Sequence, residues 1–178
     1  MSQQSTIGRA GLIGSARRFI ELWALAGGLL LVAIVLMNAY SLIADILVRK
    51  PLPGDFEMVE VGVAVAAFSF LPYCQMTSAN VTADIFTQNA GPRLVAFFVF
   101  LSALVALFFS ALLLWRMSYG LIDYYIYRET TTITGFPKWV AFVPILISLA
   151  LLAIASFISV RDAILDMRAK QRAAGGPL

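Results

Sequence analysis

The sequence contains no histidine and a single cysteine, Cys74. One cysteine excludes an internal disulfide and a CxxC redox pair. Without histidine, the chain lacks the usual ligand of haem in small membrane proteins and the base of Ser-His and Cys-His catalytic pairs. The sequence therefore predicts no catalytic residue, no metal site and no bound cofactor, and it disfavours an enzyme or a redox carrier.

Charged residues are also scarce, at 13% of the 178 residues, whereas 61% are hydrophobic. The mean hydropathy is +0.87, far above that of ordinary globular domains. The leucine- and alanine-rich runs are continuous and lack the period-two alternation of a membrane β-barrel. This pattern predicts an all-α integral membrane protein whose surface meets the lipid bilayer.

The basic residues are scattered at the ends of the apolar runs, and the net charge is only +3. Nucleic acid is therefore not an expected partner.

Four apolar runs predict four transmembrane helices in a single membrane domain covering residues 1–178. The expected spans are residues 22–47, 56–75, 94–115 and 139–160. Residues 1–21 form an N-terminal tail or an interfacial amphipathic helix, and residues 161–178 form a cytoplasmic tail. Tryptophans prefer the membrane interface, so three are predicted to be anchors there: Trp23, Trp115 and Trp139.

Positive charge predicts the orientation, because basic residues flanking spans are retained in the cytoplasm. With both termini cytoplasmic, the inside has eight basic residues: Arg9, Arg17, Arg18, Arg93, Arg161, Arg168, Lys170 and Arg172. The outside has five: Arg49, Lys50, Arg116, Arg128 and Lys138. Both tails are basic, which favours an even number of crossings.

The second span is the unusual one. Its unbroken apolar run, residues 61–73, would reach only about 20 Å as a helix, short of the ~30 Å hydrocarbon core. To cross, the helix must include Glu57 and Glu60. These carboxylates then lie in the interface or meet polar groups of another polypeptide, because an unpaired charge in hydrocarbon is costly. If Gly54 caps the helix, Glu57 falls in its first turn, where the helix dipole favours a negative charge.

In the first span, Asn38 and Ser41 are three residues apart and share a helix face. For both side chains we expect a hydrogen bond to another helix.

These features resemble the small membrane subunit of tripartite ATP-independent periplasmic (TRAP) transporters. The resemblance covers nearly the whole chain: it rests on the span spacing, the entry to span 2 at 53–57, the loop at 78–84, and 137–139 with Pro144 at the start of span 4. In that family the loop often has a histidine where Asn80 stands and an acid at the position of Asp84. The histidine is missing here, which argues against a proton-carrying role for Asn80.

The resemblance implies a bacterial or archaeal inner-membrane protein whose partners are a large membrane transport subunit and a periplasmic solute-binding protein. It also implies uptake of organic anions, such as carboxylates or sugar acids, driven by a sodium gradient. The chain would be an accessory subunit, since no span has the broken-helix pattern of a transporter core.

We expect Glu57 and Glu60 to contact another subunit, with Asn80 and Asp84 making contacts on the cytoplasmic side. Four further residues are predicted on the periplasmic side, where a solute-binding protein would dock: Asp45, Asp123, Arg128 and Glu129. A different hypothesis is a self-sufficient homodimeric transporter in which Glu60 is the proton-coupling carboxylate. A membrane-bound enzyme or redox protein is the least favoured alternative.

Overall fold

A computed structural model of the chain describes residues 4–77 and 92–174, with side chains described from 14 to 77 and from 98 to 165. These residues form four helices: α1 (Gln4–Val48), α2 (Asp55–Met76), α4 (Pro92–Ile126) and α5 (Trp139–Ala174). The described part of the chain has no strand, only an isolated bridge between Thr130 and Pro137. All four helices are long and apolar enough to cross a membrane. The predicted all-α membrane fold is confirmed.

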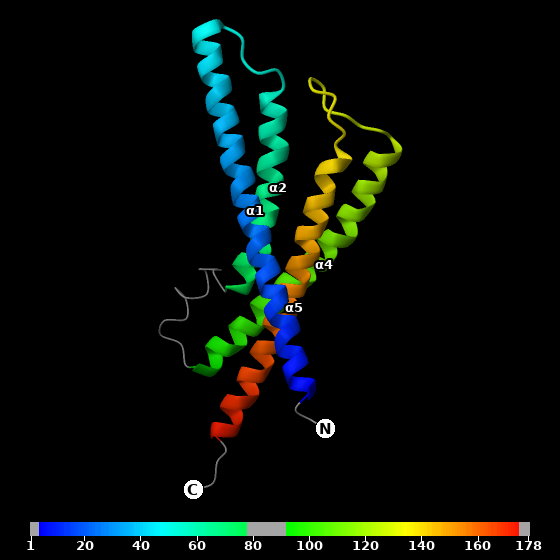
Figure 1. Ribbon diagram of the computed structural model, residues 1–178. Helices are drawn as coiled ribbons and strands as arrows, with labels where there is room; N and C mark the ends of the chain where they lie inside the picture. Colours follow the sequence, from blue (N-terminus) through cyan, green and yellow to red (C-terminus); the bar gives the residue numbers. More distant parts are fainter. Residues whose placement is uncertain (1–3, 78–91, 175–178) are drawn as a thin grey trace.

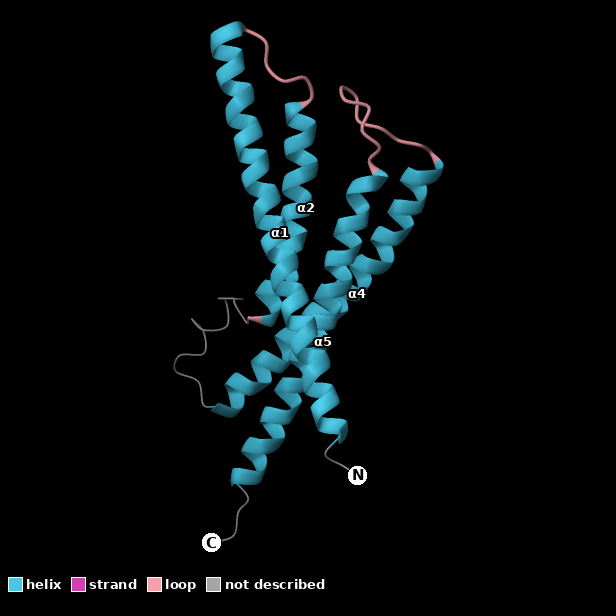
Figure 2. Cartoon of the chain, in the orientation of Figure 1, coloured by secondary structure: helices cyan, strands magenta, loops and turns pink. Residues whose placement is uncertain are grey.

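The helices pack in the order α1, α2, α5, α4, so that α2 and α5 are central. Figures 1 and 2 show two helical pairs, α1 with α2 and α4 with α5, which cross near the middle and diverge towards the end that carries their connections. The start of α1 and the end of α5 are both at the opposite end of the molecule (Figure 1). This arrangement fits an even number of crossings; which end faces the cytoplasm stays a prediction.

The helices extend beyond the predicted spans. α1 continues without a break through residues 4–21, and α5 runs on to Ala174. α2 is the shortest, with 22 residues, so it is about 33 Å long and only just matches the ~30 Å hydrocarbon core. It begins at Asp55 and includes Glu57 and Glu60, as a crossing at this place requires.

The interior is built from small side chains. Alanines and serines on all four helices are almost fully buried, including Ala66, Ala103, Ser110, Ala155 and Ser156. Large apolar side chains such as Leu29, Leu47 and Phe157 are instead more than 60% exposed. Small residues let helix backbones approach closely, and large apolar ones lose nothing by facing lipid tails. The packing is therefore that of a membrane bundle.

The contact between α1 and α2 is close at Gly27. A Cβ atom at Gly27 would lie 2.6 Å from Cβ of Ser69 and 3.4 Å from the carbonyl oxygen of Ala66. About two turns further on, a Cβ at Gly62 of α2 would collide with the side chain of Ile34. Glycine at these positions is what allows the two helices to touch.

One hydrogen bond joins α1 to α5, which are not neighbours in the packing order. The indole Nε1 of Trp23 donates to Oγ of Ser148 at 2.9 Å. Ser148, which is 1% exposed, in turn donates to the carbonyl oxygen of Pro144 at 2.8 Å. The bond fixes the crossing of the two helical pairs.

We predict that Gly27→Ala lowers the free energy of unfolding by about 1–3 kcal/mol, because the added methyl group overpacks the α1–α2 contact. Thermal unfolding in detergent, followed by tryptophan fluorescence, measures this. Gly14→Ala is the matched control, since a Cβ at Gly14 meets nothing within 4 Å. A Gly27→Ala protein that unfolds at or above the wild-type temperature would contradict the contact.

We also predict that Trp23→Phe costs about 1 kcal/mol, the scale of a hydrogen bond between helices in a membrane. The same unfolding experiment applies. Trp115→Phe is the control, because Trp115 is 61% exposed. Equal effects of the two substitutions would show that the bond to Ser148 contributes nothing.

Candidate functional site

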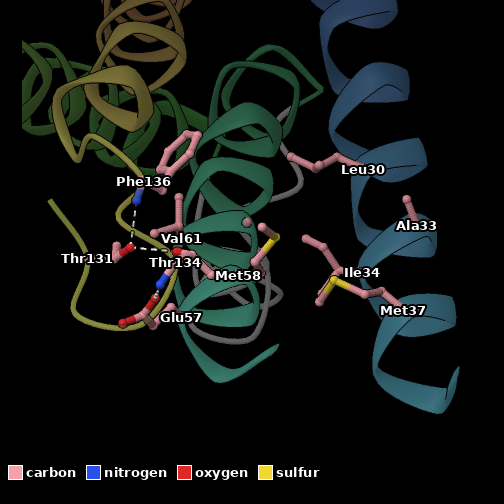
Figure 3. A pocket seen from close by; sticks show the side chains of 11 residues that line it. Leu30, Ala33, Ile34, Met37, Glu57, Met58, Val61, Thr131, Thr134 and Phe136 are labelled. Carbon is pink, nitrogen blue, oxygen red and sulfur yellow. Dashed lines mark hydrogen bonds between the residues drawn. The ribbon is translucent and has the colours of Figure 1, made fainter. Parts of the chain in front are cut away.

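The carboxylate of Glu57, in the first turn of α2, binds the connection between α4 and α5 at residues 127–138. Its Oε1 accepts a hydrogen bond from the backbone N–H of Ile133 at 2.8 Å. Its Oε2 accepts from the N–H of Thr134 at 3.0 Å and from the Thr134 hydroxyl at 2.9 Å. Figure 3 shows Glu57 at the start of α2, facing the chain that links α4 to α5. We call Glu57, Ile133 and Thr134 the Glu57 site.

The start of α2 positions the carboxylate. Gly54 caps the helix with φ +79°, and Asp55 and Glu57 lie in the first turn, as predicted. A Cβ at Gly54 would collide with the side chain of Thr134, so both the positive φ and the close approach require glycine. The connection at 49–54 therefore touches the connection at 127–138.

The connection at 127–138 folds back on itself and presents the donors. Thr131 N–H donates to the Phe136 carbonyl at 2.9 Å, and Phe136 N–H donates to Oγ1 of Thr131 at 3.0 Å. Oγ1 atoms of Thr131 and Thr134 are 2.7 Å apart. The turn closes through Gly135 at φ +65°. The N–H groups of Ile133 and Thr134 take no part in these bonds and donate instead to Glu57. Figure 3 shows Thr134 beside Glu57.

A second polar contact lies beneath the first connection. The hydroxyl of Ser41 on α1, which is 2% exposed, donates to Oδ2 of Asp55 at 2.6 Å. Oγ of Ser41 also accepts a hydrogen bond from the Leu52 N–H at 3.1 Å. The predicted helix–helix hydrogen bond of Ser41 is confirmed, and Asp55 is a partner that the sequence did not indicate. Asn38 is exposed.

Glu60 lies one turn deeper on α2 and is exposed. It lines a cavity of about 360 Å³ between α2, α4 and α5, together with Tyr124 and Lys138. The Lys138 ammonium is 3.5 Å from Oε2 of Glu129 and 5.8 Å from the centre of the Tyr124 ring. Glu57 and Glu60 thus line the same cavity, but the groups that bind Glu57 do not bind Glu60.

A separate cavity of about 280 Å³ lies between α1, α2 and the 127–138 connection. Figure 3 shows Leu30, Ile34 and Met37 of α1 on the side of Met58 of α2, with Val61 on the side of α2 nearer Phe136. Its lining is apolar except for Glu57, Thr131 and Thr134.

The residues predicted to dock a periplasmic protein are all exposed. Asp45 lies near the end of α1, whereas Asp123, Arg128 and Glu129 lie at or just after the end of α4. These helix ends are at the same end of the molecule, with α2 and α5 between them (Figure 1). Asn80 and Asp84 lie outside the described residues.

The three tryptophans have different surroundings. Trp23 is half-buried and bonded to Ser148. Trp115 is exposed and meets Tyr119 edge to face at 5.6 Å, and Trp139 meets Tyr125 in the same way at 5.7 Å. Their role as membrane-interface anchors stays a prediction.

The geometry of the Glu57 site fits a structural role in the fold better than a role in catalysis or transport. Its oxygens already accept three hydrogen bonds from the chain itself, an arrangement that was not among the roles considered for Glu57. Sequence reasoning missed Ile133 and Thr134, although a glycine and a proline after a threonine run are typical of a turn. Among the residues that the structure describes, no group of three or more histidine, cysteine, aspartate or glutamate side chains could hold a metal ion.

One comparison with known proteins, a match to a family model, agrees with this architecture. No curated protein matches the sequence. The family model of the DctQ component of tripartite ATP-independent periplasmic transporters matches residues 31–166, a range that includes the Glu57 site and parts of all four helices. This is a family of transporter components, not of enzymes. Because the match covers well over half of its length, the chain belongs to the DctQ family of small TRAP-transporter subunits and is a multi-pass protein of the prokaryotic inner membrane.

Proposed function

We propose that the chain is an accessory subunit that braces the large transport subunit in the membrane and helps to dock a periplasmic solute-binding protein. The assembly would take up organic anions such as carboxylates or sugar acids, driven by an ion gradient. The observation that carries this proposal is the Glu57 site, which ties α2 to the 127–138 connection and engages the Glu57 carboxylate in hydrogen bonds within the chain.

The continuity of the helices supports the accessory role. Carriers usually bind substrate where transmembrane helices are interrupted near the middle of the bilayer. Here Pro72 and Pro144 both lie inside helices that continue past them. The self-sufficient homodimer is not favoured, because the family is defined as one component of a tripartite system.

The docking surface would be the end that carries the connections. The exposed charges of Asp45, Asp123, Arg128 and Glu129 are all at that end. The Glu57 site supports this role because it fixes the 127–138 connection against α2, so a partner would meet a preformed surface.

The proposal is tested by affinity purification of the chain from its native membranes in mild detergent, with mass spectrometry of the accompanying proteins. We expect a much larger polytopic membrane protein in fixed proportion. Recovery of the chain alone as a stable homodimer, together with uptake by that homodimer in liposomes, would overturn the accessory role.

We predict that Glu57→Ala with Glu60→Ala lowers recovery of the large subunit and solute uptake by about tenfold or more, as expected when one partner of a buried polar contact is removed. Uptake into cells or liposomes that contain all three components measures this. Glu21→Gln, which neutralises an exposed carboxylate on α1, is the control. Wild-type transport by the double variant would show that neither glutamate is needed for the contact with the large subunit.

We predict that Glu57→Ala alone loosens the 127–138 connection, because the N–H groups of Ile133 and Thr134 lose their acceptor. Limited trypsin digestion should then cleave faster after Arg128 and Lys138, and Glu57→Gln should fall between wild type and Glu57→Ala. The control is Glu21→Ala, which removes an exposed carboxylate on α1, outside the connection that is digested. Unchanged cleavage in Glu57→Ala would contradict the role of the Glu57 site.

A further inference from the structure

Glu60 is a carboxylate inside the membrane span without a partner. It makes no hydrogen bond or ion pair with any other residue that the structure describes. Five residues after the start of α2, it lies about 8 Å along the helix. Because α2 barely spans the hydrocarbon core, this position is below the membrane surface. Charged side chains at such depth face the bundle interior or a cavity and find a partner there.

The cavity that Glu60 lines has a volume of about 360 Å³ and is lined by residues of α2, α4, α5 and the 127–138 connection. It lies where the α1–α2 pair diverges from the α4–α5 pair (Figure 1). Ala64 on α2 and Ala141 on α5 belong to its lining, with Phe142 and Ile145 as apolar surface. Small residues at such places permit close approach of a transmembrane helix.

The charge of the cavity selects a cation. Its charged lining consists of Glu57, Glu60 and Lys138. The Glu57 oxygens are occupied by the 127–138 connection, and Lys138 is already paired with Glu129. The remaining negative charge is that of Glu60. A positively charged group that enters the cavity would therefore pair with Glu60.

The same charges argue against a phospholipid head group as the occupant. A lipid ammonium group is accompanied by a phosphate, which would need a cation of its own. The one lysine in the lining is held by Glu129 and lies over the Tyr124 ring. A single arginine or lysine side chain from a transmembrane helix brings a cation with no such anion.

We propose that the cavity between α2 and α5 receives an arginine or lysine side chain from a transmembrane helix of the large subunit, and that this cation pairs with Glu60. The inference rests on the proposed function, because it requires the large subunit to be present. It adds the place of contact and the chemistry of the partner residue.

The test is recovery of the large subunit with affinity-tagged Glu60→Gln in mild detergent. Truncating one side of a buried charge pair should lower recovery by about tenfold or more, whereas Glu21→Gln should match wild type. Size-exclusion chromatography of each variant shows whether it folds. A wild-type chain that brings no large subunit overturns the proposed function and this inference together. Wild-type recovery by Glu60→Gln overturns this inference alone.

A photo-crosslinking residue in place of Ala64 identifies the occupant. We expect a crosslinked peptide from a transmembrane helix of the large subunit that contains arginine or lysine. The Glu60→Lys chain should lose the large subunit, and replacing the crosslinked basic residue with glutamate should restore it. A crosslink to phospholipid, or no restoration by the reversed pair, would overturn the inference.

Discussion

The hydrogen bonds from the N–H groups of Ile133 and Thr134 to the Glu57 carboxylate hold the start of α2 against the connection between α4 and α5. The two helical pairs diverge towards their connections (Figure 1), and these bonds link the pairs again at that end. They also satisfy a carboxylate and two peptide groups close to the hydrocarbon core, where unsatisfied polar groups are costly. Glu57 also lines the cavity beside Glu60, so this link forms part of the wall of that cavity.

The bilayer explains why so little else holds the helices together. Apolar side chains gain nothing by leaving lipid for the bundle interior, so packing relies on close backbone approach and on a few hydrogen bonds. Gly27 against Ser69 and Trp23 bonded to Ser148 are contacts of these two kinds. Both lie towards the crossing of the pairs, whereas the Glu57 site acts at the diverging end.

The fold could be predicted from the sequence because its signals are local. Apolar run length, the proline and glycine around Gly54, and the basic tails each follow from a few neighbouring residues. The partners of Glu57 could not be predicted, since they lie 76 and 77 residues away along the chain and donate through backbone N–H groups that nearly every residue carries. Ser41 could be expected to find a polar partner, but the choice of Asp55 depends on how the 49–54 connection folds.

Glu57 and Glu60 show how one helical turn separates two roles. Residues three apart share a helix face, and both side chains line the same cavity. Glu57 is level with the 127–138 connection and is satisfied by it, whereas Glu60 lies below the reach of that connection and is left without a partner in the described chain. Since α2 is too short to be shifted outward and still span the bilayer, Glu60 remains inside the membrane. The proposed pairing with a cation of the large subunit would balance its charge there.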